Sequence, residues 1–206
     1  MYDSVQMPHR SLVVSGKPGS GRTRFIQKCI QDSNGLSFIP EGFQIKLSQK
    51  SYLDNFILQL HEGLGLSRTL YEDILKLDYE HQITKTVSYI NKIINAHSFL
   101  LIEDEMSFVL YDGTISEWGK KIISHPAMID SLKIFISSRV KPRYSELRAY
   151  PQIIHINLSG FTKDERKRFF VNYCRYYNVQ IEDNDIEYFI DKLKSSPQQL
   201  EHAVLE

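Results

Sequence analysis

The stretch SLVVSGKPGSGRTRF, residues 11–25, decides the fold. A short apolar run leads into a turn with three glycines, and the hydroxyl residue Thr23 then opens a segment whose apolar residues recur at helical spacing. In a strand–loop–helix unit of this kind, backbone N–H groups and a helix N-terminus can surround a phosphate. The stretch therefore predicts a phosphate-binding loop within an α/β domain.

The loop matches the pattern G-x-x-x-x-G-K-[ST] except that Arg22 replaces the lysine. A guanidinium keeps the positive charge, but it is bulkier and forked and does not deprotonate. We therefore expect nucleotide binding to survive this change better than hydrolysis. Two alternatives are a glycine-rich turn without a ligand, and a deviant loop class in which a lysine at the position of Lys17 acts across a dimer. The residues predicted to bind nucleotide here are Gly16, Lys17, Pro18, Gly19, Ser20, Gly21, Arg22 and Thr23.

The composition limits the class of protein. The chain has 25 basic and 25 acidic residues among 206, so a dedicated nucleic-acid binder, which usually has a basic excess, is not indicated. The sequence has no apolar run long enough to span a membrane and no secretory leader. Cys29 and Cys174 form no metal-binding or disulfide pattern. We expect a cytoplasmic protein that does not enter the membrane.

The rest of the chain predicts alternating strands and helices. Short apolar strands are expected at residues 12–15, 43–48, 98–105, 132–139 and 153–158, and amphipathic helices at 23–32, 51–65 and 80–96. This alternation is typical of a parallel sheet of about five strands flanked by helices. From residue 161 two helical patterns follow without a strand, and Thr162 with Glu165 forms a capping box. We predict an α/β nucleotide-binding core over residues 1–160 and a small helical lid over 161–206.

The strand FLLIEDE, residues 99–105, ends in three acids. Ligands of α/β sheets bind at the carboxyl ends of the strands, and P-loop enzymes place a carboxylate there beside Mg²⁺. We assign Asp104 to Mg²⁺ through a water molecule, Thr23 to Mg²⁺ through its hydroxyl group, and Glu105 to the attacking water. Glu103 is the competing choice for one of these roles. The alternative is a strand that simply ends in solvated acids.

Two further positions are candidates for nucleotide contacts. Arg139 ends the strand IFISSR, residues 134–139, from which it could point at a γ-phosphate and report its presence. An ordinary surface arginine is the alternative. Pro197, in the sequence SSP at residues 195–197, would by itself be a helix breaker or a first-turn residue.

The order of these motifs resembles the nucleotide-binding domain of STAND-class P-loop ATPases, the AAA+-related branch that includes NB-ARC and NACHT modules. The loop GKPGSGRT resembles Walker A, FLLIEDE resembles Walker B, and FISSR resembles the T-[ST]-R sensor. The sequence SSPQQL resembles the Gly-x-Pro motif of the lid, although Ser195 replaces the glycine. The resemblance covers residues 12–200.

This resemblance implies an ATP/ADP switch that uses Mg²⁺ and hydrolyses ATP slowly, with catalytic roles for Glu105, Asp104 and Arg139. It implies that Pro197 packs near the adenine. It also implies a signalling or innate-immunity protein that forms homo-oligomers on activation, with sensor and effector domains elsewhere in a longer parent. We accordingly expect the chain to be a piece of that parent, with a truncated lid.

Two other functions are compatible with the motifs. An AAA+-type ATPase of a loader or remodelling complex would need an arginine finger at a subunit interface and a sensor arginine in the lid, where Gln198 and Gln199 stand. A scaffold that retains the fold without nucleotide is the other alternative.

Overall fold

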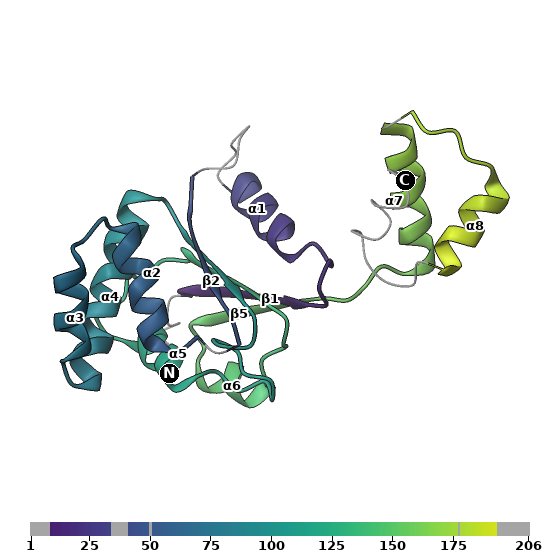
Figure 1. The fold of residues 1–206 in the computed structure, drawn as a ribbon. Helices are drawn as coiled ribbons and strands as arrows, with labels where there is room; N and C mark the ends of the chain where they lie inside the picture. Colours follow the sequence, from purple (N-terminus) through teal and green to yellow (C-terminus); the bar gives the residue numbers. More distant parts are fainter. Residues whose placement is uncertain (1–8, 34–40, 50, 177, 193–206) are drawn as a thin grey trace.

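The fold is built on a sheet of five parallel strands (Figure 1). The computed structural model describes residues 9–33, 41–49, 51–176 and 178–192. The strand order across the sheet is β2-β3-β4-β1-β5. In chain order the elements are β1 (Ser11–Gly16), α1 (Arg22–Ser33), β2 (Phe43–Leu47), α2 (Leu53–Gly63), α3 (Arg68–Leu75), α4 (Tyr79–Ala96), β3 (Leu100–Asp104), α5 (Glu117–Ser124), β4 (Ile134–Ser138), α6 (Tyr144–Ala149), β5 (Ile153–Leu158), α7 (Lys163–Tyr176) and α8 (Asp183–Lys192).

This architecture confirms the predicted α/β class. All five predicted strands are present, and α1, α2 and α4 occupy the segments expected to be helical. Three further helices, α3, α5 and α6, were not predicted. In the part of the chain that the structure describes, none of the helices combines the length and apolar character that crossing a membrane would require.

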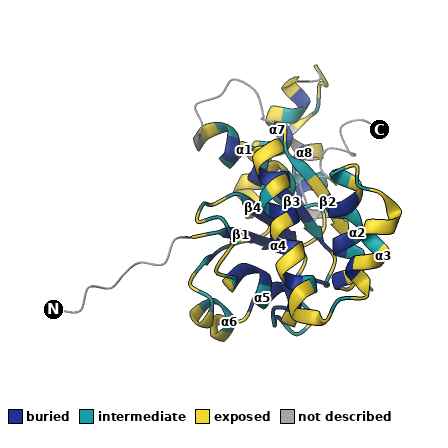
Figure 2. Cartoon of the chain, turned by 90° about the vertical axis from the view of Figure 1, so that its left-hand side faces the viewer, coloured by how far each residue is buried: buried dark blue, intermediate teal, exposed yellow. Residues whose placement is uncertain are grey.

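Helices cover both faces of the sheet, which explains why the three inner strands β1, β3 and β4 are largely buried and mostly apolar. All five residues of β4 are buried (Figure 2). On one face α1 packs on alternate strand residues, among them Val14 of β1 and Leu101 of β3. On the other face α2, α4 and α5 cover the residues in between, among them Val13 and Ile102. The face to which a strand residue points is thus set by the two-residue period of the strand.

The last two helices have a hydrophobic core of their own. Phe170 and Cys174 of α7 pack with Ile186 and Ile190 of α8, and the pair stands to one side of the sheet in Figure 1. The predicted capping box at the start of α7 is confirmed: the Thr162 N–H donates to Glu165 Oε2 at 2.8 Å, and the Glu165 N–H donates to Thr162 Oγ1 at 3.3 Å. The division into a core of residues 1–160 and a lid of residues 161–206 stays a prediction.

The packing predicts a large difference between two leucine-to-alanine substitutions. Leu101 is 3% exposed within the sheet and Leu70 is 49% exposed on α3. We expect Leu101→Ala to lower the free energy of unfolding by about 2–5 kcal/mol, because it leaves a cavity, and Leu70→Ala to change it by less than about 1 kcal/mol. Urea denaturation followed by the fluorescence of Trp118, which is buried in the core, measures both values. Equal effects of the two substitutions would contradict this packing.

Candidate functional site

The ends of three neighbouring strands lie at one level of the sheet. Ser15 of β1 and Asp104 of β3 are both register partners of Ser138 of β4, which lies between them. The chain leaves each of these parallel strands at the same edge. The glycine loop after β1 and the charged residues after β3 and β4 therefore meet, as the sequence predicted for a ligand site.

The glycines of the loop meet two different requirements. Gly19 and Gly21 have φ angles of 75° and 82°, a backbone region that residues with a Cβ atom rarely adopt. At Gly16 the requirement is space, because a Cβ atom there would lie 2.7 Å from Ser20 Oγ and 3.0 Å from the Leu158 carbonyl oxygen. The loop is thus folded tightly between β1 and α1, with the N-terminus of α1 directly after it.

Unpaired donors at the loop indicate an anion site. Ser20 Oγ and Arg22 Nη1 are buried, and neither has a hydrogen-bond partner among the described residues. A buried donor without a partner costs about 1–3 kcal/mol, so each favours a ligand that accepts a hydrogen bond. The first turn of α1 carries no acidic residue that would compete for its N–H groups. The residues present therefore fit a phosphate group.

Arg22 lies among charges of both signs. Burial lowers the pKa of its guanidinium; Glu105 opposes this shift and Arg139 adds to it, with smaller opposing effects from Asp104 and Glu103. An arginine keeps its charge at neutral pH despite such a shift. The start of α1 and the ends of β3 and β4 thus place two guanidinium groups and three carboxylates in one electrostatic environment.

Glu103 is the acid that faces the loop. It follows Leu101 at the two-residue period and so points to the face that α1 covers. The Thr23 hydroxyl donates to Glu103 Oε1 at 3.5 Å, a long contact, and Lys46 Nζ lies 3.8 Å from Oε2. The side chain of Glu103 is 31% exposed, which leaves it accessible to a ligand. Glu103 and Thr23 are therefore the pair that the structure brings together.

The environment of Asp104 does not favour its predicted water-mediated role at Mg²⁺. Asp104 points to the opposite face, is 1% exposed, and accepts hydrogen bonds from the N–H groups of Ser107, Phe108 and Val109 at 2.8, 2.7 and 3.0 Å. Its fourth bond comes from Ser138 Oγ at 2.9 Å. Burial raises the pKa of Asp104, and these four hydrogen bonds oppose that shift. A carboxylate so occupied is a structural group that holds the loop after β3.

Glu105 and Arg139, two of the residues predicted to be catalytic, lie together. Arg139 Nη1 donates to Glu105 Oε2 at 2.6 Å in an ion pair whose side chains are 37% and 54% exposed. The ion pair is exposed enough to exchange partners. A phosphate would compete with Glu105 for the guanidinium, and the glutamate would then be free to hold a water molecule.

The remaining predicted residues are less informative. Lys17 and Pro18 are exposed at the tip of the loop. Pro197, predicted to lie near adenine, is outside the described residues. A cavity of about 180 Å³ lies beside the loop, next to the segment that follows β5. Its lining consists of Ser20, Gly21, Phe25, Leu158, Ser159, Gly160 and Phe161.

Sequence reasoning missed the hydrogen bonds of two buried serines beneath the site. Ser138 accepts a hydrogen bond from the Val140 N–H at 3.2 Å while it donates to Asp104, so it fixes the backbone on both sides of Arg139. Buried Ser15 lies 2.8 Å from His155 Nε2 and donates to Asn157 Oδ1 at 2.9 Å. The available signal was a set of polar residues at alternate positions within apolar strands.

Comparison with known proteins supports the fold. No protein-family model and no curated protein sequence matches the chain. Among solved structures it resembles a replication initiator DnaA bound to AMPPCP and single-stranded DNA, with a TM-score of 0.56, 12% identity, and coverage of 98% of this chain and 56% of that one. It also resembles the RuvB Holliday junction branch migration motor of Thermotoga maritima, with a TM-score of 0.53, 14% identity, and coverage of 96% of this chain and 53% of that one. A Walker-type ATPase of Pyrococcus abyssi is similar too, with a TM-score of 0.54, 13% identity, and coverage of 93% of this chain and 61% of that one.

The chain spans little more than half the length of these proteins. At such low identity the likeness concerns the fold alone. That fold is the α/β fold of P-loop NTPases, with five parallel strands between helices.

Substitutions of the two neighbouring acids should differ in their effect on stability. Asp104→Asn replaces one acceptor oxygen by an NH₂ group that faces N–H donors, so we expect the free energy of unfolding to fall by about 2 kcal/mol or more. Glu103→Gln removes a partly exposed charge and should change it by about 0.5 kcal/mol at most. Urea denaturation with Trp118 fluorescence compares the two. If Asp104→Asn were as stable as the parent protein, the structural role of Asp104 would be wrong.

Proposed function

We propose that this chain is an ATP/ADP-binding switch module with slow ATP hydrolysis. The observation that carries the proposal is the buried, unpaired Nη1 atom of Arg22 beside a tightly folded glycine loop and the N-terminus of α1. These donors suit the phosphates of a nucleotide. The cavity between the loop and the segment after β5 gives the rest of the nucleotide a place beside the phosphates.

Thr23 and Glu103 are the residues that would hold Mg²⁺. The described residues contain no group of three or more His, Cys, Asp or Glu side chains that could hold a metal ion by themselves, without ligands from a nucleotide. Mg²⁺ usually takes one or two protein ligands and completes its shell with phosphate oxygens and water. When bound with nucleotide, Mg²⁺ would neutralise phosphate charge. This assignment places Glu103 in the role first given to Asp104.

Two features of the site favour slow turnover. Arg22 stands where a lysine ammonium would reach between phosphates, and its planar fork approaches oxygens differently. Glu105, the residue proposed to orient water, is held by Arg139 at 2.6 Å and must be released first. We propose that a γ-phosphate draws Arg139 away from Glu105. The site then distinguishes ATP from ADP through Arg139, which gives the differential affinity that any switch needs.

The motif order supports a STAND-type signalling or defence protein, in which nucleotide exchange drives homo-oligomerisation. The separate core of α7 and α8 supports this idea, because a helix pair with its own packing can move relative to the sheet as one body. Other domains of a longer parent would supply the sensor and the effector. Cys29 and Cys174 are free thiols, which suits the reducing cytoplasm.

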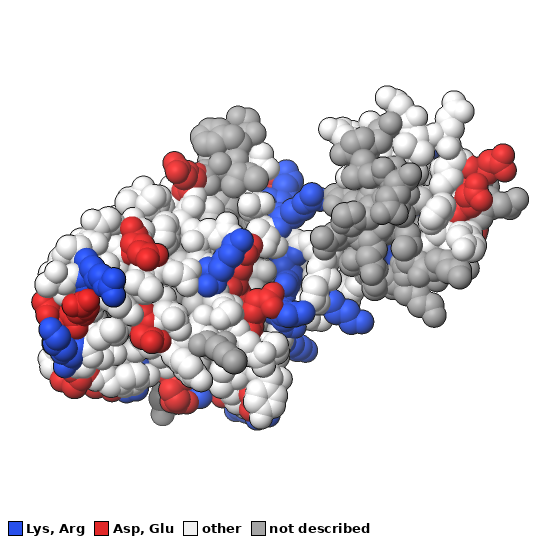
Figure 3. Space-filling view, viewed as in Figure 1, with Lys and Arg blue, Asp and Glu red and all other residues white. Residues whose placement is uncertain are grey.

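A second candidate is an AAA+-type loader or remodelling ATPase. It is favoured by the resemblance to DnaA and to the RuvB motor. Binding to nucleic acid would then be expected. On the face seen in Figure 3, basic side chains gather near the middle of the molecule, with acidic side chains beside them. Ring assembly with fast, oligomer-dependent hydrolysis would favour this candidate over the switch.

Calorimetric titration with Mg-ADP and Mg-ATP tests the proposed nucleotide site. We expect dissociation constants of about 100 μM or lower for both, since phosphate and Mg²⁺ contacts are present. Thr23→Ala should weaken binding in the presence of Mg²⁺ and leave Mg²⁺-free binding unchanged, while Thr69→Ala on the exposed start of α3 serves as the control. Folded protein that binds neither nucleotide would contradict the proposal and favour a nucleotide-free scaffold.

One conservative substitution tests the effect of Arg22 on the rate of ATP hydrolysis. We expect Arg22→Lys to raise ATP turnover roughly tenfold, because an ammonium reaches the phosphates more compactly, with little change in affinity. Arg24→Lys on the same helix is the matched control and should change neither quantity. Unchanged or lower turnover in Arg22→Lys would show that the guanidinium is integrated into the site.

A further inference from the structure

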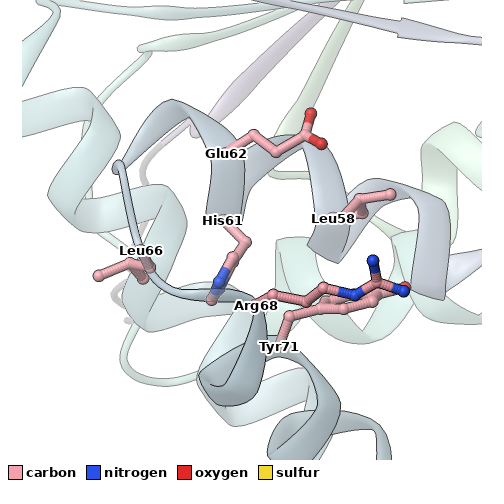
Figure 4. Close-up of a pocket in the computed structure, with 6 residues that line it drawn as sticks. All are labelled: Leu58, His61, Glu62, Leu66, Arg68 and Tyr71. Carbon is pink, nitrogen blue, oxygen red and sulfur yellow. The ribbon is translucent and has the colours of Figure 1, made fainter.

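A second cavity lies in the helical layer, away from the glycine loop. It measures about 380 Å³ and opens between α2 and α3 (Figure 4). The glycine loop joins α1 on the other face of the sheet. Small-molecule sites usually begin at about 300 Å³, so the cavity suits a small ligand. The lining residues, shown as sticks in Figure 4, are Leu58, His61, Glu62, Leu66, Arg68 and Tyr71.

His61 offers an unused hydrogen-bond acceptor at this cavity. Its side chain is only 2% exposed, and its Nε2 atom lies 2.6 Å from the Ser67 carbonyl oxygen. A carbonyl oxygen can only accept, so Nε2 carries a proton, and Nδ1 is an acceptor whenever it carries none. Nδ1 is buried, and none of the residues that the structure describes donates to it. A ligand with an N–H group would satisfy an atom that is otherwise costly to bury.

The walls suit an aliphatic chain that carries a cation. Leu58 and Leu66 supply apolar surface. The ring of Tyr71 lies 5.8 Å from the ring of His61, and the Arg68 and Tyr71 side chains extend from α3 toward Leu58 in Figure 4. The face of an aromatic ring attracts an ammonium or guanidinium within about 6 Å.

One acidic and one basic side chain, Glu62 and Arg68, line the cavity. Arg68 is offset by Glu72, whose Oε1 lies 3.3 Å from its Nε atom. Glu62 is exposed at the cavity and forms no ion pair within the described part of the chain. The pKa of Tyr71 is raised by burial first, and then by Asp54 and Glu62, so a negative potential reaches its hydroxyl group.

We propose that this cavity binds an alkyl cation, namely an ammonium or guanidinium group on a short aliphatic chain. Its N–H groups would pair with His61 Nδ1 and Glu62, its charge would lie over Tyr71, and its chain would contact Leu58 and Leu66. Free amines and the arginine side chain of a polypeptide share this chemistry. The proposal is independent of nucleotide binding, because it concerns other residues on the opposite face of the sheet.

Calorimetric titration with four probes tests the proposal. Agmatine represents a free alkyl guanidine, and the peptide acetyl-Gly-Arg-Gly-amide represents an arginine side chain; whichever binds more tightly identifies the source. Pentanoate and 1-pentanol have similar chains with a negative charge or none, and we expect neither to match the cations. The proposal fails if neither cation binds at about 10 mM, or if pentanoate binds as tightly as agmatine.

Substitutions of residues that line the cavity test whether agmatine binds there. Glu62→Gln should weaken agmatine binding about three- to fivefold, whereas Glu182→Gln, an exposed acid before α8, should not weaken it. Leu58→Trp should abolish binding by filling the cavity. In the unsubstituted protein, the ¹⁵N resonance of His61 Nδ1 should shift when agmatine is added. An unmoved resonance, or unchanged affinity in Glu62→Gln, would overturn the proposal.

Discussion

The hydrogen bonds of the Asp104 carboxylate are the constraint on which the rest of the site depends. One buried group receives three backbone N–H donors from the loop after β3 and the hydroxyl of Ser138 at the end of β4. It therefore ties together the two strand ends that carry Glu105 and Arg139. Because β4 lies between β1 and β3, the same network sets how these two residues meet the glycine loop.

This arrangement separates the acids by role. Glu103 faces α1 and Thr23, Asp104 faces the opposite layer, and Glu105 pairs with Arg139 at the exposed edge. Three consecutive carboxylates thus have three environments, of which only two remain accessible to a ligand. The proposed switch follows from that division, since a phosphate can change the partner of Arg139 without disturbing the buried network beneath it.

Much of the fold could be predicted from the sequence, because apolar runs and glycine turns have clear periods. The five strands, α1, α2, α4 and the capping box at Thr162 follow from such patterns. The helices α3, α5 and α6 were missed, since they are short and their stability comes from packing.

The site could be predicted in position but not in detail. The convergence of Arg22, Glu105 and Arg139 followed from strand order and strand ends. The proposed exchange of Glu103 for Asp104 at Mg²⁺ did not, because it depends on two facts together. Strand alternation turns Asp104 away from α1, and the backbone N–H groups that occupy it belong to a loop whose conformation no sequence period describes.

A crystal structure with a bound non-hydrolysable Mg-ATP analogue would test the central claim most directly. The account predicts Mg²⁺ beside Thr23 and Glu103, Asp104 still bound to its four donors, and the Arg139 guanidinium moved from Glu105 to the γ-phosphate. Mg²⁺ held by Asp104, or an Arg139–Glu105 pair that persists beside a bound γ-phosphate, would contradict it.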